Sequence, residues 1–499
     1  MTETSTRDTT EAELDRVLES AAEAAEPFGA LAPRDRAAVL RAVSGAVDAS
    51  ADELVPIAQQ ETRLAEARLR GELARTGFQL RLFADVLDDG GYLEAAIDGP
   101  DPDWPVGPRP DLRRVLEPIG PVVVFGASNF PFAFSVIGGD SASALAAGNP
   151  VVVKAHPGHP ELSVRTGEIV AGALREAGAP TGTFAVVLGE ETGRRAVVHP
   201  RTRAVGFTGS IPGGRALHDL AAGRPDPIPF YGELGSTNPV FVTRAAAAAR
   251  GESLFAEYAD SFTLGAGQFC TKPGVLLLPE GAALEPLAEA VRRRPAAALL
   301  NERIERGFTA GLRSLADHPA VEVLVEGGPS DDTVDTDGAD GGTAWTPSLV
   351  HTSARRFLEH LDDLLEERFG PVSLVVTYSE ESELLGIADA LPGQLTATVH
   401  GEESDGVAAP LLDRLRRRAG RVLWNGWPTG VSVTHAMHHG GPYPATTSVL
   451  HTSVGGTAIR RFLRPVCYQQ VPQHLLPEVL RDGNPLDVPR RVNGELRLP

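Results

Sequence analysis

One of the two cysteines in this chain, Cys270, lies in a glycine-rich segment that suits a reactive thiol. The segment reads Gly-Ala-Gly-Gln-Phe-Cys-Thr-Lys-Pro-Gly over 265–274, and Glu233 precedes the cysteine by 37 residues in Phe-Tyr-Gly-Glu-Leu-Gly-Ser. A thiol is a natural nucleophile toward an aldehyde carbonyl, and a carboxylate can activate the water that hydrolyses the resulting thioester. The pair therefore points to covalent chemistry on an aldehyde.

Two apolar runs upstream each lead to a polar side chain that suits binding or catalysis. Asn129 follows the run at 121–125, and its amide could donate a hydrogen bond to a developing oxyanion. Taken alone, an Asn in this place favours a helix N-cap or a turn. Lys154 ends the run at 150–153, and a cation at the carboxyl end of a strand suits a ribose hydroxyl or a phosphate. The alternative, a plain surface lysine, is weakened because Lys154 and Lys272 are the only lysines in the sequence.

A third segment combines a short strand, a glycine turn and the start of a helix. It reads Val-Gly-Phe-Thr-Gly-Ser-Ile-Pro-Gly-Gly over 205–214. Backbone amides at such a helix start suit a pyrophosphate, although the spacing differs from a GxGxxG fingerprint and is weak as a bare pattern. A fourth segment, Glu-Arg-Phe-Gly-Pro over 367–371, indicates by itself only a helix that stops at Gly-Pro.

The elements that must position these side chains follow an alternating pattern. Residues 11–86 are rich in Ala, Leu, Arg and Glu with a helical period, which predicts helices. Short β-branched runs then alternate with helical stretches, in one series at 122–125, 151–154, 184–188 and 204–207 and in a second at 239–242, 275–278, 321–325, 373–377 and 421–423. This alternation predicts an α/β fold with two doubly wound parallel-sheet domains, the second of which carries Cys270.

The composition limits the class of the 499-residue chain. Its length predicts two or three domains. The net charge of −20 argues against nucleic-acid binding, which needs basic patches. No stretch is apolar enough for a transmembrane helix, and the polar, acidic N-terminus does not resemble a secretory leader, so no membrane association is expected. Two cysteines cannot form a disulfide framework, which predicts a cytoplasmic location.

Other acidic, sulfur and imidazole groups have no expected catalytic role. The acidic, lysine-poor composition fits a salt-adapted surface and a GC-rich genome about equally well. The Asp-rich segment 328–342 has Thr333 where a calcium loop needs Asp or Asn, so a solvated loop is expected. Cys467 has no glycine neighbours and is expected to be a buried structural thiol. The 13 histidines show no metal-ligand spacing, so no metal is expected, and those within 435–439 are expected to line a pocket.

The order of these segments is more specific than any one of them. The chain resembles the aldehyde dehydrogenase superfamily in the order Asn129, Lys154, Gly209, Glu233, Cys270 and Glu367-x-Phe369-Gly-Pro. The resemblance runs from the early helices to the C-terminal tail. Within it, the chain is similar to the NADP-linked 2-oxoglutarate-semialdehyde (2,5-dioxopentanoate) dehydrogenase branch, which also includes fatty-aldehyde dehydrogenases. The similar stretches are 125–134, 232–241, 267–274, 425–430, 438–446 and 461–469.

The resemblance implies a mechanism. Cys270 attacks the aldehyde to give a thiohemiacetal, whose oxyanion is held by the Asn129 amide and the Cys270 backbone N–H. Hydride transfer to the nicotinamide leaves a thioester, and Glu233 activates the water that releases the acid. The implied activity is NAD(P)-dependent oxidation of an aldehyde, with 2-oxoglutarate semialdehyde as the preferred substrate and a long-chain or general aldehyde as the alternative. A CoA-acylating enzyme or a non-catalytic relative is less favoured because all three residues are present.

The resemblance also implies how the cofactor binds. Many NAD-preferring members place a Glu three residues after the strand lysine, where it repels a 2′-phosphate; Pro157 stands there, so NADP is expected, with NAD as the second choice. The acidic residues at 190–191 stand where NADP-linked relatives tend to supply a cation, a role that Arg194 or Arg195 could fill instead. The cofactor-binding residues implied are Ser128, Lys154, Thr208, Gly209, Ser210, Gly214, Glu367 and Phe369.

By the same resemblance, a small β element joins subunits into a homodimer or homotetramer, with the dimer preferred. The expected division is a cofactor-binding Rossmann-like domain at 1–91 and 121–235 with 441–463 returning to it, a catalytic α/β domain at 236–440, and an oligomerisation segment at 92–120 and 464–499.

A semialdehyde carboxylate needs an arginine or backbone donors in the substrate tunnel. Arginines are so abundant in this sequence that none can be singled out. The pocket is expected to involve Phe132, Phe134, Phe269, Trp427 and the loop 428–437. Ordinary core packing explains any one of these aromatic residues about as well.

Overall fold

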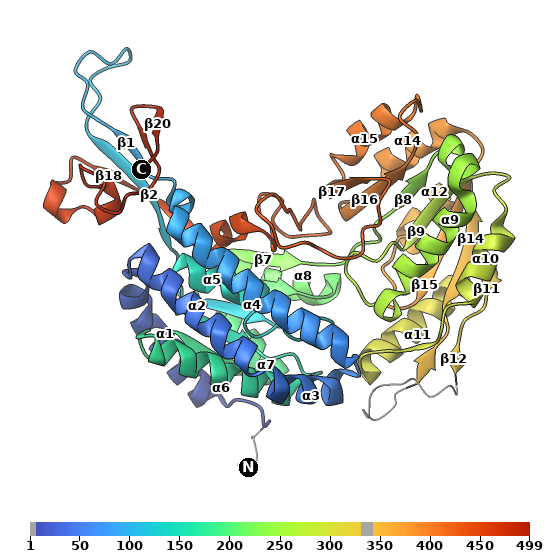
Figure 1. Ribbon diagram of the computed structural model, residues 1–499, viewed down its shortest axis with the longest axis horizontal. Coiled ribbons are helices and arrows are strands. Elements are labelled where there is room, and N and C mark those ends of the chain that lie inside the picture. The colour runs from blue at the N-terminus through green and yellow to red at the C-terminus, as the bar shows by residue number, and fades with distance from the viewer. Residues whose placement is uncertain (1–5, 331–342) are drawn as a thin grey trace.

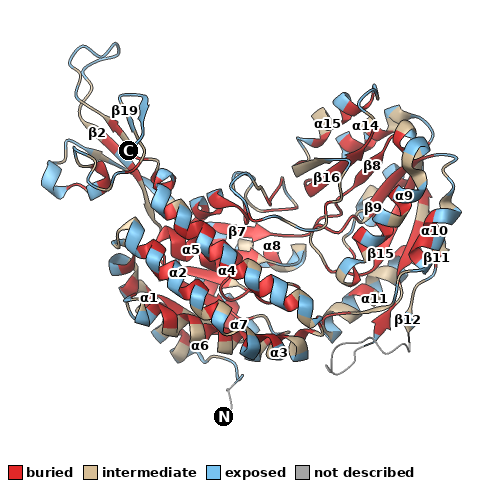
Figure 2. Ribbon diagram, viewed as in Figure 1, coloured by how far each residue is buried: buried red, intermediate tan, exposed pale blue. Residues whose placement is uncertain are grey.

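The computed structural model describes residues 6–330 and 343–499 of the chain. Figure 1 shows two α/β lobes and an arm that projects from the first lobe. Figure 2 shows that the buried residues follow the strands of both lobes and the inner faces of the surrounding helices. A solvated loop was expected over 328–342; Pro329–Ser330 instead form a short strand, and 331–342 lie outside the described residues.

The first lobe is built on a sheet of five parallel strands in the order β5-β4-β3-β6-β7. Its strands are β3 (Val122–Phe125), β4 (Val151–Lys154), β5 (Phe184–Val187), β6 (Ala204–Thr208) and β7 (Phe230–Glu233). Its helices are α1 (Glu11–Gly29), α2 (Pro33–Ala49), α3 (Ala51–Thr62), α4 (Glu66–Asp89), α5 (Gly139–Ala147), α6 (Pro160–Glu176), α7 (Glu190–Val198) and α8 (Ile211–Ala222).

Alternation along the strands explains why helices cover both faces of this sheet. In β3, Val122 and Val124 pack into the large core with Leu145 of α5, whereas Val123 packs with Leu18 of α1. Because successive strand residues point to opposite faces, an all-apolar strand can be stable only with cover on both sides. The doubly wound sheet predicted from the apolar runs is confirmed.

The second lobe is built on a sheet of seven strands in the order β11-β14-β15-β9-β8-β16-β17. All neighbours are parallel except β11, which pairs antiparallel with β14 at the edge. Its strands are β8 (Val240–Val242), β9 (Val275–Pro279), β11 (Glu322–Val325), β14 (Ser348–Ser353), β15 (Val372–Tyr378), β16 (Gln394–His400) and β17 (Ala419–Trp424). A small neighbouring sheet contains β10 (Ala297–Ala298), β12 (Pro329–Ser330) and β13 (Ala344–Trp345).

Helices also surround the second sheet (Figure 1). They are α9 (Arg244–Thr263), α10 (Leu284–Arg292), α11 (Glu302–Ala316), α12 (Ala354–Glu359), α13 (Leu361–Leu364), α14 (Glu381–Ala390) and α15 (Ala408–Leu415). Short 3₁₀ helices are η1 (Gly91–Leu93), η2 (Leu264–Gly267), η3 (Gly456–Phe462), η4 (Gln473–Leu475) and η5 (Glu478–Leu480). No helix in the described ranges is long and apolar enough to cross a membrane.

The arm is a third sheet, in the order β18-β2-β1-β19-β20. Its strands are β1 (Ala96–Asp98), β2 (Leu112–Pro118), β18 (Leu463–Gln469), β19 (Arg490–Val492) and β20 (Glu495–Arg497). Cys467 lies in β18 and is exposed, so the expectation of a buried structural thiol is wrong. The physical reason is that β18 is an edge strand, on which alternate side chains face solvent.

Strand register brings the ends of the first sheet together. Phe125 of β3 pairs with Lys154 of β4 and with Phe207 of β6, and Thr208 pairs with Glu233 of β7. Since the strands are parallel, Lys154, Thr208 and Glu233 all lie at the carboxyl edge of the sheet. Ligands of open α/β sheets bind at this edge.

Candidate active site

The loop before Cys270 has a backbone conformation that favours glycine. Gly265 and Gly267 have φ values of +58° and +66° within η2. A Cβ on Gly267 would lie 2.3 Å from the carbonyl oxygen of Gly370, so only glycine lets these two segments touch. The close approach joins the cysteine loop to the Glu-Arg-Phe-Gly-Pro segment.

Asn238 fixes the far side of the cysteine loop. Its side-chain nitrogen donates to the carbonyl oxygens of Cys270 at 2.8 Å and of Lys272 at 2.9 Å. Asn238 is fully buried with φ +48°, and its backbone N–H donates to the side-chain oxygen of Gln394. Satisfied buried polar groups of this kind hold a loop in one conformation.

The Cys270 thiol is half-buried and contacts His439, whose Nε2 lies 3.5 Å from Sγ. The pKa of the thiol is raised to about 12, chiefly by burial and also by the charges of Glu367 and Glu233, while Arg421 opposes the rise. The resting group is therefore a thiol, and a base must remove its proton before attack.

His439 is a neutral imidazole in this setting. Its pKa is lowered to about 3, chiefly by burial and also by the positive charge of Arg421. Its backbone N–H donates to Thr452 Oγ1 at 2.8 Å, which fixes the residue against the thiol. A neutral ring nitrogen beside Sγ can exchange a hydrogen bond with the sulfur.

Asn129 lies beside the cysteine loop. Its side-chain nitrogen donates to the carbonyl oxygen of Gln268 at 2.9 Å, and its own carbonyl accepts from Arg68 at 2.7 Å. An amide nitrogen carries two hydrogens, so a second donation toward an oxyanion is compatible with the Gln268 bond. The predicted proximity of Asn129 to the cysteine loop is therefore seen in the structure.

We expect Asn129→Ala to lower kcat about 100- to 1,000-fold, because one oxyanion donor is worth roughly 3–4 kcal/mol. KM should change little, since the donor acts mainly after the carbonyl becomes tetrahedral. Steady-state kinetics with a saturating cofactor test this. A variant with normal kcat and only a raised KM would show that Asn129 binds the ground state instead.

Glu233 is buried at the end of β7 in a charge cluster with two partners. Arg461, itself 1% exposed, bonds the carboxylate of Glu233 and donates to Asp140 at 2.8 Å. Two carboxylates share one guanidinium, so the neutral cluster carries one proton on a carboxyl group. Burial raises the pKa of Glu233 to about 8, Arg461 opposes the rise, and the charge of Asp140 adds to it.

A general base works only when deprotonated, so this pKa sets a pH dependence. We expect the rate of thioester hydrolysis to be low below pH 8 and to rise through an apparent pKa near 8. Asp140→Asn should move that apparent pKa to lower pH by about one unit, because removing a negative neighbour favours the Glu233 carboxylate. Deacylation rates measured across pH test the shift.

The matched control is Asp219→Asn, which changes an exposed carboxylate of α8 that pairs with Arg215. This variant should keep the wild-type profile. A profile of Asp140→Asn that is unchanged or moved to higher pH would contradict the assignment of the titration to the buried cluster.

The residues expected to bind the adenosine and pyrophosphate lie at the carboxyl edge of the first sheet. Lys154 is 8% exposed; burial lowers its pKa and Glu190 opposes this. A Cβ on Gly193 would lie 3.1 Å from the Lys154 side chain, so glycine lets α7 pack against the end of β4. Ser128 and Thr208 are half-buried and Gly209 is exposed beside them.

Helix α8 begins at this edge. Ser210 is its N-cap, and the side-chain oxygen accepts from the backbone N–H of Gly213. A Cβ on Gly214 would lie 2.2 Å from Leu234, so glycine allows α8 to pack on the segment after β7. The exposed glycine turn at a helix start fits a pyrophosphate, which prefers free backbone N–H groups there.

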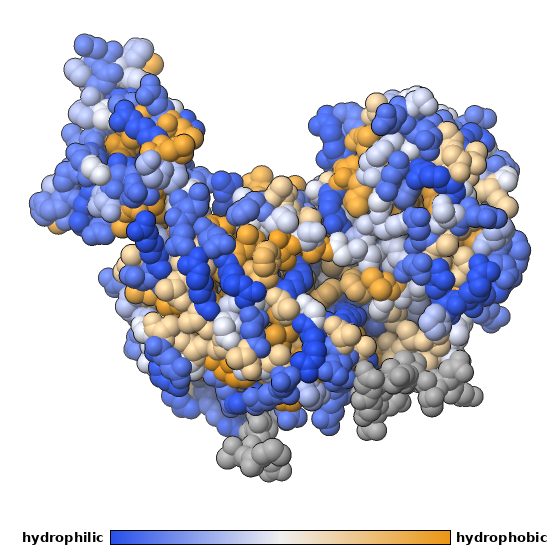
Figure 3. Space-filling model, in the orientation of Figure 1, coloured by the Kyte–Doolittle hydropathy of each residue, from blue (hydrophilic) through white to orange (hydrophobic). Residues whose placement is uncertain are grey.

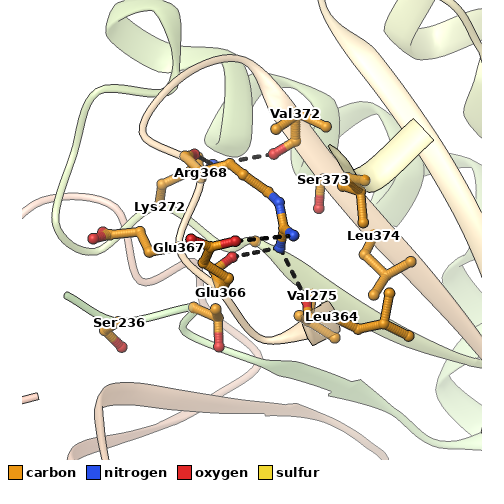
Figure 4. Close-up of a pocket in the computed structure, with 13 residues that line it drawn as sticks. Ser236, Lys272, Val275, Leu364, Glu366, Glu367, Arg368, Val372, Ser373 and Leu374 are labelled. Carbon is orange, nitrogen blue, oxygen red and sulfur yellow. Dashed lines mark hydrogen bonds and ion pairs between the residues drawn. The ribbon is translucent and has the colours of Figure 1, made fainter. Parts of the chain in front are cut away.

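Glu367 is half-buried and lies against Gly235, where a Cβ would be 2.5 Å from its Oε2. Figure 4 shows it beside Lys272 in a pocket that Ser236 also lines. Burial raises the pKa of Glu367, while the charge of Lys272 opposes the rise. The Lys272 ammonium donates to the carbonyl oxygens of Arg368, Gly370 and Val372 and so fixes the segment. Phe369 packs against the core of the first lobe.

The aromatic residues expected in the pocket divide into two sets. Phe134 lies with its ring centroid 6.3 Å from that of His439, and Phe269 packs edge-on against Phe130 at 5.3 Å. Phe132 is 1% exposed within the large core, and Trp427 packs on Tyr258 at 5.6 Å. Phe134 and Phe269 thus lie near the cysteine loop, whereas Phe132 and Trp427 serve core packing.

Three residues near the thiol were absent from the predicted site: Asn238, His439 as a thiol contact, and Arg461. Asn238 lies in the stretch 232–241 that the sequence analysis singled out. The available sequence signal for a special role was its position before a proline within that stretch. Arg461 begins the stretch 461–469, which was also singled out, but its role had no local signal because its partners Asp140 and Glu233 are 321 and 228 residues away.

One group in the described part of the chain has metal-ligating side chains within reach of one another, namely His318, His360 and Asp363. The Nδ1 of His318 accepts a hydrogen bond from the backbone N–H of Ala320 at 3.1 Å. A neutral His318 therefore carries its proton on Nε2, which faces Asp363 at 3.8 Å.

Comparison with known proteins agrees with the geometry. The family model described as "Aldehyde dehydrogenase family" matches residues 2–464. Alpha-ketoglutaric semialdehyde dehydrogenase 2 of Azospirillum brasilense is 45% identical over 492 residues, covering 97% of this chain and 92% of that protein. Alpha-ketoglutaric semialdehyde dehydrogenase of Acinetobacter baylyi is 42% identical over 493 residues, covering 97% and 91%.

A solved structure gives the same fold. The 1-pyrroline-5-carboxylate dehydrogenase from Thermus with bound NAD superposes with a TM-score of 0.74 at 24% identity, covering 92% of this chain and 86% of that one. The family match spans nearly the whole chain and includes the glycine-flanked Cys270 and the buried Glu233. The chain therefore belongs to the aldehyde dehydrogenase family.

Proposed function

We propose that this aldehyde dehydrogenase oxidises 2-oxoglutarate semialdehyde to 2-oxoglutarate. The observation that carries the proposal is the near full-length identity of 45% and 42% to two alpha-ketoglutaric semialdehyde dehydrogenases. The site geometry supports it, because a half-buried thiol has an amide donor, an imidazole and a buried carboxyl group around it.

In the proposed mechanism, the Cys270 thiol releases its proton to solvent water, and its sulfur forms a bond to the aldehyde carbon. Asn129 and the Cys270 backbone N–H donate to the oxyanion of the thiohemiacetal. NAD(P), when bound, accepts the hydride that leaves this carbon. Glu233 then takes a proton from water, whose oxygen attacks the thioester carbon, and the acid leaves as the Cys270 sulfur regains its proton.

We propose that Ser128, Lys154 and the glycine turn at 208–214 hold the adenosine and pyrophosphate of the cofactor, and that Glu367 and Phe369 contact the nicotinamide ribose. Support comes from the shared edge of Lys154 and Thr208 and from the exposed start of α8. NADP is the proposed cofactor, because Pro157 offers no carboxylate to repel a 2′-phosphate.

The two arginines expected near that 2′-phosphate form ion pairs with carboxylates of the protein. Arg194 and Arg195 both pair with Glu191, and Arg195 also pairs with Glu11. A ratio of kcat/KM for NADP over NAD above one is expected, and a ratio below one would overturn the choice. Glu190→Gln should raise the ratio, since Glu190 interacts with Lys154.

The substrate is tested with purified protein at low and high salt. A kcat/KM for 2-oxoglutarate semialdehyde at least about tenfold above that for a long-chain aldehyde, close to 1.4 kcal/mol, supports the proposal. A preference for the long-chain aldehyde would leave the mechanism intact and assign the protein to general aldehyde oxidation.

We further propose a homo-oligomer joined through the arm and a cytoplasmic location. Figure 3 shows apolar side chains gathered on the arm, and Val106, Leu496 and Leu498 there are exposed by 92%, 61% and 73%. Apolar side chains exposed to this extent favour contact with a second subunit. Two free thiols support a reducing compartment.

A further inference from the structure

Two arginines from different lobes hold adjacent carbonyl groups of one loop. Arg421 of β17 donates to the carbonyl oxygens of Pro428 at 2.5 Å and of Gly430 at 3.0 Å. Arg75 of α4 donates to the carbonyl oxygen of Val431 at 3.3 Å. Because Gly430 and Val431 are consecutive residues, both guanidinium groups contact the same short segment of this loop.

The same loop borders the reactive thiol. The backbone N–H of Gly430 donates to the hydroxyl of Thr271, the residue after Cys270, at 3.3 Å. The Arg75 guanidinium lies 5.2 Å from the ring centroid of Phe134. Phe134 neighbours His439, which contacts the thiol. Both arginines therefore stand at the wall of the space that faces Cys270.

Each guanidinium has a buried nitrogen without a hydrogen-bond partner among the described residues. These atoms are Nη1 of Arg75 and Nε of Arg421. Burial lowers the pKa of both arginines, and the negative charge of Cys270 opposes this in each case. A buried charged donor without a hydrogen-bond partner is energetically costly. We therefore expect these two nitrogens to donate to a bound ligand.

The carboxyl group of Glu72, whose charge acts on Arg75, does not fill that place. Glu72 lies one turn before Arg75 on α4, but its Oε1 accepts the backbone N–H groups of Phe132 and Ala133 at 2.8 and 2.9 Å. Burial raises the pKa of Glu72 to about 7, so near neutral pH it is partly protonated. It therefore supplies only part of a negative charge to Arg75.

We propose that Arg75 and Arg421 together bind the carboxylate of the aldehyde substrate, Arg75 through Nη1 and Arg421 through Nε. This inference rests on the proposed function and names the residues that give it specificity. A carboxylate has two oxygens and accepts from two guanidinium groups with charge-assisted bonds. A neutral aldehyde in the same tunnel leaves both donors unpaired, and such sites discriminate strongly against the analogue that lacks the polar group.

The test compares 2-oxoglutarate semialdehyde with pentanal, a neutral aldehyde with the same number of carbons. The readout is the ratio of their kcat/KM values for the wild type, Arg75→Met, Arg421→Met and Arg421→Lys. We expect each methionine variant to lower this ratio roughly 10- to 100-fold, as for lost hydrogen bonds to a charged group. Most of the loss should appear in KM for the semialdehyde.

Arg421→Lys separates two roles of one side chain, because the charge of Arg421 also favours the thiolate of Cys270. The lysine keeps that charge but not the planar donor geometry, so it should restore pentanal turnover more than semialdehyde turnover. The matched control is Arg81→Met on the same helix; Arg81 pairs with Asp48 at the surface, and its ratio should equal that of the wild type.

The experiment distinguishes failure of this inference from failure of the proposed function. If the wild type oxidises pentanal but not the semialdehyde, the proposed function fails. If the wild type prefers the semialdehyde and the methionine variants keep the wild-type ratio, or lose both substrates equally, carboxylate binding by these arginines is overturned.

Discussion

Replacement of Cys270 by alanine is expected to abolish aldehyde oxidation. The sulfur forms the only covalent bond to the substrate in the proposed mechanism, so without it no thiohemiacetal forms and no hydride leaves. Removal of a nucleophile commonly costs roughly 10⁴-fold or more in kcat. Aldehyde-dependent reduction of NADP by the purified variant, followed by absorbance, measures the effect.

The chain supplies its own control, since Cys467 is the other cysteine and lies exposed on the arm. Cys467→Ala should retain wild-type kcat, whereas Cys270→Ala should retain cofactor binding without turnover. Cys270→Ser separates the loss of the nucleophile from a change in packing, because a hydroxyl nearly preserves the size of the side chain but is a far weaker nucleophile. Near-wild-type activity of that variant would rule out Cys270 as the nucleophile.

Parts of this site were predictable because they obey local rules. Apolar four-residue runs predict buried parallel strands, and parallel strands present their carboxyl ends at one edge. That reasoning places Lys154 and Thr208 at one edge, and the strand register agrees. The strand that ends at Glu233 was not predicted from the sequence and is seen in the structure. The glycine-rich segment around Cys270 was recognised from the sequence, and the structure shows that Gly267 in it takes a positive φ against Gly370.

Other parts depend on contacts between distant segments, for which the sequence holds no local signal. Arg461 reaches Glu233 across 228 residues, and Arg75 reaches Val431 across 356. Nearly all basic residues of this sequence are arginines, so the sequence does not show which arginines are buried in the site. The wrong prediction that Cys467 is buried has a similar cause. A single sequence does not distinguish an edge strand from a central strand, because the residue patterns of the two are similar.

Glu233→Gln is expected to separate the two halves of the reaction. Glutamine keeps the size and a hydrogen-bonding oxygen for Arg461 but cannot take a proton from water. Oxidation by Cys270 should therefore proceed once, and hydrolysis of the thioester should slow about 10²- to 10⁴-fold. Rapid mixing of enzyme, NADP and aldehyde should show a burst close to one reduced cofactor per active site, followed by slow turnover.

The pH profile gives this prediction a second, independent readout. In the wild type, deacylation should rise through the pKa of Glu233 near 8, because only the carboxylate accepts the proton. In Glu233→Gln the rise should disappear, since no titrating base remains at that position. Glu285→Gln, an exposed change on α10, should keep both the profile and the steady-state rate. A Glu233→Gln variant with no burst but a slow first turnover would instead make Glu233 the base that deprotonates Cys270, placing its role before hydride transfer.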